Sequence, residues 1–280
     1  MIEINQKITK TDEAWKRLYA RLEEDNLLTK TKRTGRRLYL KWGVAAAVLV
    51  GVMYCATLWV IPARDEVPQG LLTQENKEKS TLVKTLEDGS VVYLAQESTL
   101  QYPEHFATDK REVNLQGEAF FDIVKNPEQT FLIETEKVRV EVLGTAFDVR
   151  SKEDFPFCLS VRRGKVKVSL KQGGQSVFAK AGETVTLQPE GLQLSETGYS
   201  AQFNRYVSNI RFKDEPLENV LQVINKESSH WQIETASPVL NKKKLTVEFS
   251  NNSPEAVAEL ICWTFNLKCD RQGNKLILSE

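Results

Sequence analysis

Short stretches in which apolar and polar residues alternate fill the middle of the chain, from residue 81 to residue 195. Such alternation gives a β-strand one apolar face. The clearest stretches cover residues 90–94, 111–115, 131–134, 138–142, 165–170 and 184–187. Glycine-containing pairs typical of tight turns punctuate them: Asp88-Gly89, Gly173-Gly174, Ala181-Gly182 and Glu190-Gly191. No stretch between these limits has a helical period, so we predict an all-β domain over residues 81–195.

From residue 209 onward, strand-like stretches alternate with amphipathic helical ones. The order is strand 210–212, helix 216–227, strand 231–234, then strand 245–249, helix 254–265, and strands 267–269 and 275–278. Pro216 and Pro254 lie in the first helical turns, where proline is favoured. Phe212 and Phe249 each end a strand just before a helix. Residues 205–280 are therefore predicted to form a small α+β domain of two successive βαβ units, in a chain that is otherwise mainly β.

Residues 42–61 form a long uncharged run, WGVAAAVLVGVMYCATLWVI. The last nineteen of these residues would rise about 28 Å as a helix, close to the thickness of a bilayer's hydrocarbon core. Trp42 and Trp59 lie near its ends, where aromatic rings prefer the headgroup level, and Pro62 follows it. A buried core helix is the alternative, but such helices are shorter and carry a polar face. We predict a single transmembrane helix.

The charges on either side of this run predict its orientation. Six basic residues precede it between residues 30 and 41, whereas Arg64 is followed by Asp65 and Glu66. Because basic residues concentrate on the cytoplasmic side, we expect a cytoplasmic N-terminus and a C-terminal region on the far side. About forty mostly polar residues come first, which favours a retained anchor over a cleaved signal peptide. Residues 62–80 are polar and predict a juxtamembrane linker.

The tail before the span, residues 1–41, has an apolar stripe on an otherwise charged helical pattern. Trp15, Leu18 and Leu22 recur at three- and four-residue spacing. A segment this short seldom folds alone, so the stripe either docks on a partner or lies on the membrane surface. The acidic residues 23–25 disfavour an anionic lipid surface. We therefore favour docking, with these three side chains as the anchors.

Composition limits the classes of function that the chain can serve. Its 38 basic and 38 acidic residues give a net charge of zero, which offers no sign of direct nucleic-acid binding. Cys55 lies in the predicted span, and Cys158, Cys262 and Cys269 lie beyond it. The sequence leaves open whether Cys262 and Cys269 pair or are buried as small apolar residues. No cysteine or histidine spacing is typical of a metal site, so we expect no metal and no cofactor.

Candidate catalytic residues are few. His105 and His230 lie far apart in the sequence. Glu118 and Asp122 fall on one face of a predicted strand but about 13 Å apart, which is wide for a glycosidase pair. We interpret these acids as capping or turn residues, and we predict no enzymatic activity and no catalytic residue.

Five motifs of the β-region, taken in order, resemble those of the FecR family. They cover residues 86–94 with 98–103, 111–113 with 117–123, 142–149, 164–166 and 181–183. The positions that carry the resemblance are Asp88, Gly89, Gly117, Glu118, Phe121, Asp122, Gly144, Thr145 and Phe147. The segment 212–221 resembles the short N-terminal domain of secretins and TonB-dependent receptors. The resemblance identifies an all-β periplasmic FecR-type domain followed by this α+β domain.

The resemblance implies a transmembrane anti-sigma factor of the inner membrane. Its cytoplasmic part would bind an extracytoplasmic-function sigma factor. Its periplasmic part would contact the signalling domain of a TonB-dependent outer-membrane transporter, and a site-specific membrane protease commonly takes part in the release of the sigma factor. Transcription of uptake genes would follow. Many relatives carry a longer cytoplasmic region, so here sigma binding is expected to rest on the single helix with Trp15, Leu18 and Leu22.

Two other functions fit the same domain order. The chain could be an envelope scaffold, or a glycan-binding module tethered to the membrane. Neither needs an apolar stripe in the cytoplasm, so the tail favours the anti-sigma hypothesis over both.

Overall fold

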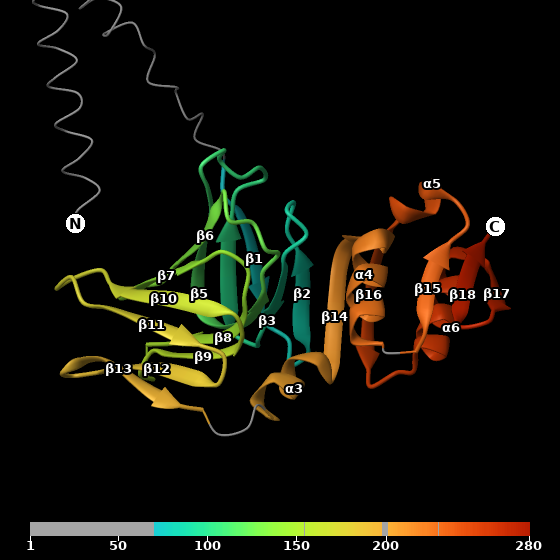
Figure 1. Ribbon diagram of the computed structural model, residues 1–280. Helices are drawn as coiled ribbons and strands as arrows, with labels where there is room; N and C mark the ends of the chain where they lie inside the picture. The colour runs from blue at the N-terminus through green and yellow to red at the C-terminus, as the bar shows by residue number, and fades with distance from the viewer. Residues whose placement is uncertain (1–69, 154, 198–200, 229) are drawn as a thin grey trace, which may run out of the picture. The chain divides into compact units, whose positions relative to one another are not determined.

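The computed structural model describes residues 70–153, 155–197, 201–228 and 230–280 (Figure 1). These residues belong to one compact unit, which spans 67–280. The predicted tail, with Trp15, Leu18 and Leu22, and the predicted span, with Trp42 and Trp59, lie outside the described residues. Within the described part of the chain, no helix is long and apolar enough to cross a membrane.

From residue 72 to residue 196 the described chain forms thirteen strands and no helix, as predicted. We call this part the β-domain. Its strands are β1 (Leu72–Asn76), β2 (Thr81–Thr85), β3 (Val91–Leu94), β4 (Ser98–Tyr102), β5 (Lys110–Asp122), β6 (Thr130–Glu134), β7 (Val138–Val142), β8 (Ala146–Ser151), β9 (Cys158–Arg163), β10 (Lys165–Leu170), β11 (Ser176–Lys180), β12 (Glu183–Gln188) and β13 (Gly191–Glu196).

Strand β1 corrects the predicted linker, because it lies inside residues 62–80 and pairs antiparallel with β4. Its sequence, LTQEN, is mostly polar and mostly exposed, so it has no apolar alternation to reveal it. The strand is held instead by its ladder and by the buried Asn76. The Asn76 amide donates to the carbonyl oxygens of Ser80 and Leu94, at 2.9 Å each.

The long strand β5 joins the two sheets of the β-domain. Residues 110–116 pair with β4 and β6, whereas residues 117–122 pair with β3 and β8. The change of partners falls at Gly117, whose φ of 102° lies in the region that favours glycine. A Cβ at this residue would lie 2.8 Å from the Cα of Ser98 on β4. The close approach of β4 and β5 therefore requires a glycine.

Inward-facing side chains of both sheets form one apolar core. The rings of Phe121 and Phe147 stack in it, with centroids 5.5 Å apart. Strand β7 shows the predicted alternation, since Val138 and Val140 are buried and Arg139 between them is exposed. The period of two in the sequence thus identified the faces of these strands correctly.

The C-terminal domain, residues 209–279, follows a short helix α3 (Ala201–Val207). Its elements are β14 (Asn209–Pro216), α4 (Leu217–Glu227), β15 (Gln232–Thr235), α5 (Pro238–Asn241), β16 (Lys244–Ser250), α6 (Pro254–Phe265), β17 (Lys268–Gln272) and β18 (Lys275–Ser279). The predicted strands and both predicted helices are present, and α6 has the predicted bounds. The sequence did not reveal α3 or α5.

The pairing of these strands differs from the two βαβ units that the sequence predicted, in which the strands on either side of each helix would lie in one sheet. Strand β14 pairs antiparallel with β16, whereas β15 pairs parallel with β18, which also pairs with β17. The strands before and after α4 therefore belong to different sheets, and each sheet takes strands from both repeats. Helix α4 contacts both β14 and β15, and Figure 1 shows the two long helices between the two sheets.

Candidate functional site at the junction of the two domains

The C-terminal domain extends a sheet of the β-domain. Strand β14 pairs parallel with β2, with Ile210 opposite Thr81 and Phe212 opposite Val83. Figure 1 shows β2 and β14 side by side. Parallel pairing of two strands so far apart in sequence is a property of the tertiary fold. The junction between the domains is therefore a hydrogen-bonded seam.

A buried carboxylate anchors one end of this seam. Glu215 on β14 is fully buried, and its Oε2 lies 2.8 Å from the Nζ of Lys84 on β2. Its Oε1 accepts from the side-chain amide of Asn219 at 2.7 Å and from the backbone N–H of Thr85 at 3.4 Å. A buried carboxylate with these partners is compensated in charge and in hydrogen bonds.

A second cluster joins α3 to β5 and β8. The Tyr206 hydroxyl donates to Asp148, and Arg205 pairs with Glu118. The Arg205 guanidinium also lies 3.5 Å from Asp148, and that of Arg150 lies 3.7 Å from Glu118. Two carboxylates of the β-domain therefore hold the helix that leads into the C-terminal domain.

Burial changes the ionisation of this cluster. It raises the pKa of Asp148 to about 6, although the Tyr206 hydrogen bond and the Arg205 charge oppose the rise. Burial, together with the charges of Asp148 and Glu118, also raises the pKa of Tyr206. The tyrosine therefore stays a neutral donor, and Asp148 is the member of the cluster whose proton responds to mild acid.

A third contact reaches helix α4. The carboxylate of Asp122, at the end of β5, pairs with Lys226 of α4 and accepts from Arg163 of β9 at 2.9 Å. The predicted capping or turn roles of Glu118 and Asp122 are therefore wrong. Both lie within β5 and form ion pairs with residues of other elements. Their side chains share one face of the strand, because positions an even number of residues apart face the same way.

The face of β5 between these two acids is apolar. The Phe120 ring lies 5.6 Å from that of Tyr93, 5.5 Å from that of Phe203 and 5.8 Å from that of Tyr206. Its neighbour Phe121 points into the core of the β-domain. The end of β5 is thus buried on both faces, and a run of apolar residues within the 117–123 motif is the sequence signal for this.

The remaining motif residues shape the β-domain itself. Asp88 accepts from Arg111 at 2.6 Å, and Arg111 is fully buried. Gly89, with φ 79°, ends the turn that begins at Leu86, since its N–H donates to the Leu86 carbonyl oxygen at 3.0 Å. A Cβ at Gly144 would meet the backbone of Lys125, so the close approach there also requires glycine. Thr145 is buried, and its carbonyl oxygen accepts from the backbone N–H of Ile123 at 2.9 Å.

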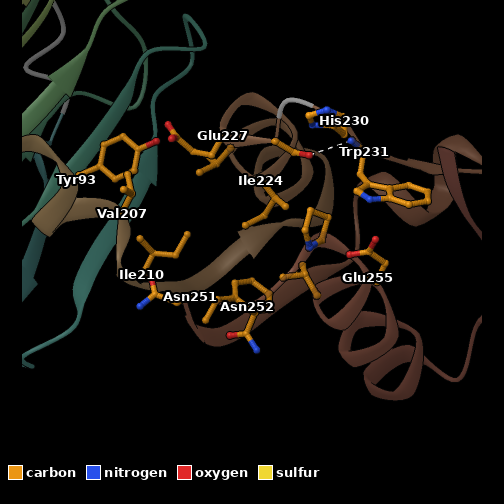
Figure 2. A pocket seen from close by; sticks show the side chains of 15 residues that line it. Tyr93, Val207, Ile210, Ile224, Glu227, His230, Trp231, Asn251, Asn252 and Glu255 are labelled. Atoms are coloured by element: carbon orange, nitrogen blue, oxygen red, sulfur yellow. Dashed lines mark hydrogen bonds between the residues drawn. The ribbon is translucent and has the colours of Figure 1, made fainter. Parts of the chain in front are cut away.

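Beside the seam lies a pocket of about 580 Å³ (Figure 2). Tyr93 contributes the wall from the β-domain, and the other lining residues come from α3 and the C-terminal domain. They are Val207, Ile210, Val223, Ile224, Glu227, Ser228, His230, Trp231, Phe249, Asn251, Asn252, Pro254, Glu255 and Val257. Volume and lining are those of a small-ligand site.

Among the described residues, no group of three or more His, Cys, Asp or Glu side chains could hold a metal ion. Cys158, Cys262 and Cys269 are free thiols. Cys262 is buried, and burial, together with the neighbouring Cys269, raises the pKa of its thiol to about 12. Ser253 of the sequence Asn251-Asn252-Ser253 caps α6, since its hydroxyl accepts from the backbone N–H of Ala256.

Comparison with known proteins agrees with the motifs. Residues 73–167 match the family described as FecR protein. No curated protein matches the chain. Two crystal structures of a candidate anti-sigma factor from Parabacteroides distasonis ATCC 8503, at 1.65 and 2.50 Å resolution, are similar to it. Each is 23% identical, covers 75% of this chain and 99% of its own, and has a TM-score of 0.47. At that level the likeness assigns no function by itself.

The match defines the class of the β-domain. The motifs predicted an all-β region followed by a small α+β region, and the structure shows the all-β region as two sheets. Residues 73–167 are a FecR domain, and the family resemblance is thereby confirmed.

Proposed function

We propose that the chain is an anti-sigma factor that spans the inner membrane once, with a cytoplasmic N-terminus and a periplasmic C-terminal region. The observation that carries the proposal is the FecR domain over residues 73–167. The uncharged run 42–61 and its basic flank support the span and its orientation. The chain would have no enzymatic activity and would act by binding.

On the cytoplasmic side, residues 1–41 bind an extracytoplasmic-function sigma factor. The apolar stripe of Trp15, Leu18 and Leu22 supports this assignment, because burial of three large side chains stabilises a complex by several kcal/mol at ~1.5–3 each. A segment that folds on binding has a lower affinity per unit of interface and is released more readily. A signal then shifts the sigma equilibrium only if it favours one of two states of the chain.

On the periplasmic side, the C-terminal domain receives the signalling domain of a TonB-dependent transporter. Strand β17 supports this part of the proposal. It lies at one edge of the sheet β15-β18-β17, and all five of its residues are exposed. An exposed edge can accept a strand from a partner, and Lys268 and Arg271 on it would limit pairing with chance partners.

The tail is tested with the full chain and the sigma factor encoded beside its gene. Co-purification should yield a stable complex, and Trp15→Ala should weaken it about tenfold or more, since a buried tryptophan contributes several kcal/mol. Lys16→Ala, on the charged face of the same predicted helix, is the matched control and should bind as the parent does. Equal binding by Trp15→Ala would remove the anchor role.

The periplasmic half is tested by crosslinking from single-site probes placed along residues 205–280 to the transporter's signalling domain. Contacts on β17 would support strand addition. Contacts confined to residues 81–195 would contradict it. Failure to recover any sigma factor with the full chain would instead favour the scaffold or glycan-binding hypothesis. A membrane protease that cleaves the chain on signalling is the further partner that the family resemblance suggests.

A further inference from the structure

The pocket beside the seam has an apolar floor with polar groups above it. Ile210 of β14, Ile224 of α4 and Phe249 of β16 line the floor. Figure 2 shows Tyr93 on one side and Trp231 and Glu255 on the other. The volume of about 580 Å³ falls in the range of small-ligand sites, and the lining is mixed rather than purely apolar.

One polar group of a buried side chain opens into this pocket. Tyr93 is 1% exposed, and its hydroxyl forms no hydrogen bond with any described residue. Figure 2 shows this hydroxyl directed toward Glu227 and the cavity. The Tyr93 side chain is buried while its hydroxyl opens into the pocket, so this hydroxyl can bond the polar group of a ligand.

The charges around the pocket select the sign of that ligand. Glu227 and Glu255 both line it, together with His230. No lysine or arginine lines the pocket. Two carboxylates in the lining disfavour an anion and favour a cation with N–H donors.

The aromatic wall already accepts a cation. The guanidinium carbon of Arg271 lies 4.4 Å from the centroid of the Trp231 ring. Tryptophan is the aromatic residue best suited to this interaction. The Trp231 ring therefore contacts the Arg271 cation and also lines the pocket.

We propose that this pocket binds an amphipathic cation: a ligand with an apolar body that fills the floor and an ammonium or guanidinium group that reaches Glu227 and the Tyr93 hydroxyl, while Glu255 on the opposite side adds to the negative charge of the lining. The source of this chemistry is either a free amine or a lysine or arginine side chain of a peptide. The inference does not depend on the anti-sigma function.

Such a ligand would touch both domains at once. Tyr93 belongs to β3 of the β-domain, whereas Glu227 ends α4. The residue before it, Lys226, forms the ion pair with Asp122 across the junction. A cation at Glu227 therefore binds directly beside an interdomain contact, and a ligand that bridges both walls favours the joined arrangement of the two domains.

The test uses the full chain in detergent, labelled with 5-fluorotryptophan and observed by ¹⁹F NMR. The probes are 2-phenylethylammonium, 2-phenylethanol and phenylacetate, which share an apolar body and differ in charge. The ammonium should shift the Trp231 resonance and bind more tightly than the alcohol. Its affinity should exceed that of phenylacetate by a still larger factor. Trp263, which is 81% exposed and does not line the pocket, is the internal reference and should not shift.

Variants assign the groups. Glu227→Gln should weaken binding of the ammonium about threefold, as expected for a partly exposed carboxylate, Glu255→Gln on the opposite side should weaken it less, and the double variant should weaken it more than either. Tyr93→Phe keeps the ring and should weaken it severalfold. Glu259→Gln, on the exposed side of α6, is the matched control and should have no effect. An unfolding midpoint equal to that of the parent shows that each variant is folded.

Two results would overturn the proposal. One is equal binding of the three probes, or no shift of Trp231 by the ammonium at millimolar concentration. The other is unchanged charge selectivity in the double glutamine variant. The source is decided with N-acetyl-Phe-Lys-amide and its norleucine analogue. A peptide that binds more tightly than the free amine, and only with lysine, assigns the pocket to a protein segment, whereas the reverse order assigns it to a small amine.

Discussion

Two buried charged residues of the FecR domain are compensated in different ways. Arg111 is fully buried, yet it donates to Asp88 and to the carbonyl oxygens of Val124 and Gln129, so its charge and its donors have partners. Asp148 accepts from the Tyr206 hydroxyl and lies 3.5 Å from the guanidinium of Arg205, and burial raises its pKa to about 6. The first residue is a fixed structural charge, and the second is a group that titrates in mild acid.

The raised pKa of Asp148 predicts a specific pH dependence of stability. Between its ordinary pKa of 3.8 and its folded value of about 6, only the folded state holds the proton. The contribution of Asp148 to the free energy of unfolding is therefore largest below pH 4, falls as the pH rises to about 6, and is constant above that. Over this window the loss is about 3 kcal/mol.

Asp148→Asn should remove this component. The difference in unfolding free energy between the variant and the parent should grow in favour of the variant from pH 4 to pH 6 and then level off. Chemical unfolding at a series of pH values measures it. The comparison cancels the titration of all other carboxylates, so a difference that does not change with pH would contradict the raised pKa.

For single residues, the sequence showed which side chains matter but not what they contact. Glu118 and Asp122 stood out as motif residues, but their partners Arg205 and Lys226 lie far later in the chain and in no recognisable motif. A carboxylate on a strand can cap a turn, face solvent or pair across a fold. Only the tertiary arrangement decides among these, so the capping interpretation failed.

Among the elements, the best-predicted one carries its own end signals. Helix α6 begins after the capping Ser253 with a proline in the first turn, and it ends at Asn266, which is left-handed with φ 55°. Strand β1 and helix α5 carry weaker signals. The strand lacks apolar alternation, and the helix has only four residues. Their formation depends on neighbours rather than on local pattern.

Two glycines of the β-domain provide a matched test of close packing. Gly117 has φ 102° and faces the backbone of Ser98, whereas Gly173 has φ 94° and nothing within 4 Å of its would-be Cβ. Both alanine variants should lose ~1–2 kcal/mol to backbone strain. Gly117→Ala should lose roughly 1–3 kcal/mol more, because β4 must move. Midpoints of chemical unfolding compare them, and equal losses would show that strain alone matters at Gly117.

For the whole molecule, the sequence predicted two domains but not their junction. The two regions differ in the period of their apolar residues, with strands alone first and then strands with helices. The pairing of β2 with β14, and the division of each repeat between two sheets, involve residues remote in sequence. No local pattern encodes register between such strands. Seam and pocket therefore appear only in the fold.

The ion pair of Lys84 and Glu215 should stabilise this junction. Lys84→Met leaves Glu215 buried without a cation, and the expected loss is on the order of 2–4 kcal/mol, reduced somewhat because Lys84 is partly exposed. Lys244→Met is the matched control, since Lys244 and its partner Asp214 are both exposed, and it should lose less than about 1 kcal/mol. Equal losses in chemical unfolding would show that the Lys84–Glu215 pair contributes no more than a surface pair.

The partnership of β2 and β14 has a consequence for biosynthesis. Strand β2 is among the first parts of the FecR domain to be made, and β14 is made only after the domain's last strand. Until then the β2 edge is unpaired, and an unpaired strand edge readily pairs with strands of other chains. A chain shortened before residue 209, by a nonsense codon or by a protease, would therefore not end as a finished FecR domain. Its β2 edge would have unpaired backbone N–H and C=O groups and would be prone to aggregation. The C-terminal domain, through β14, protects this edge.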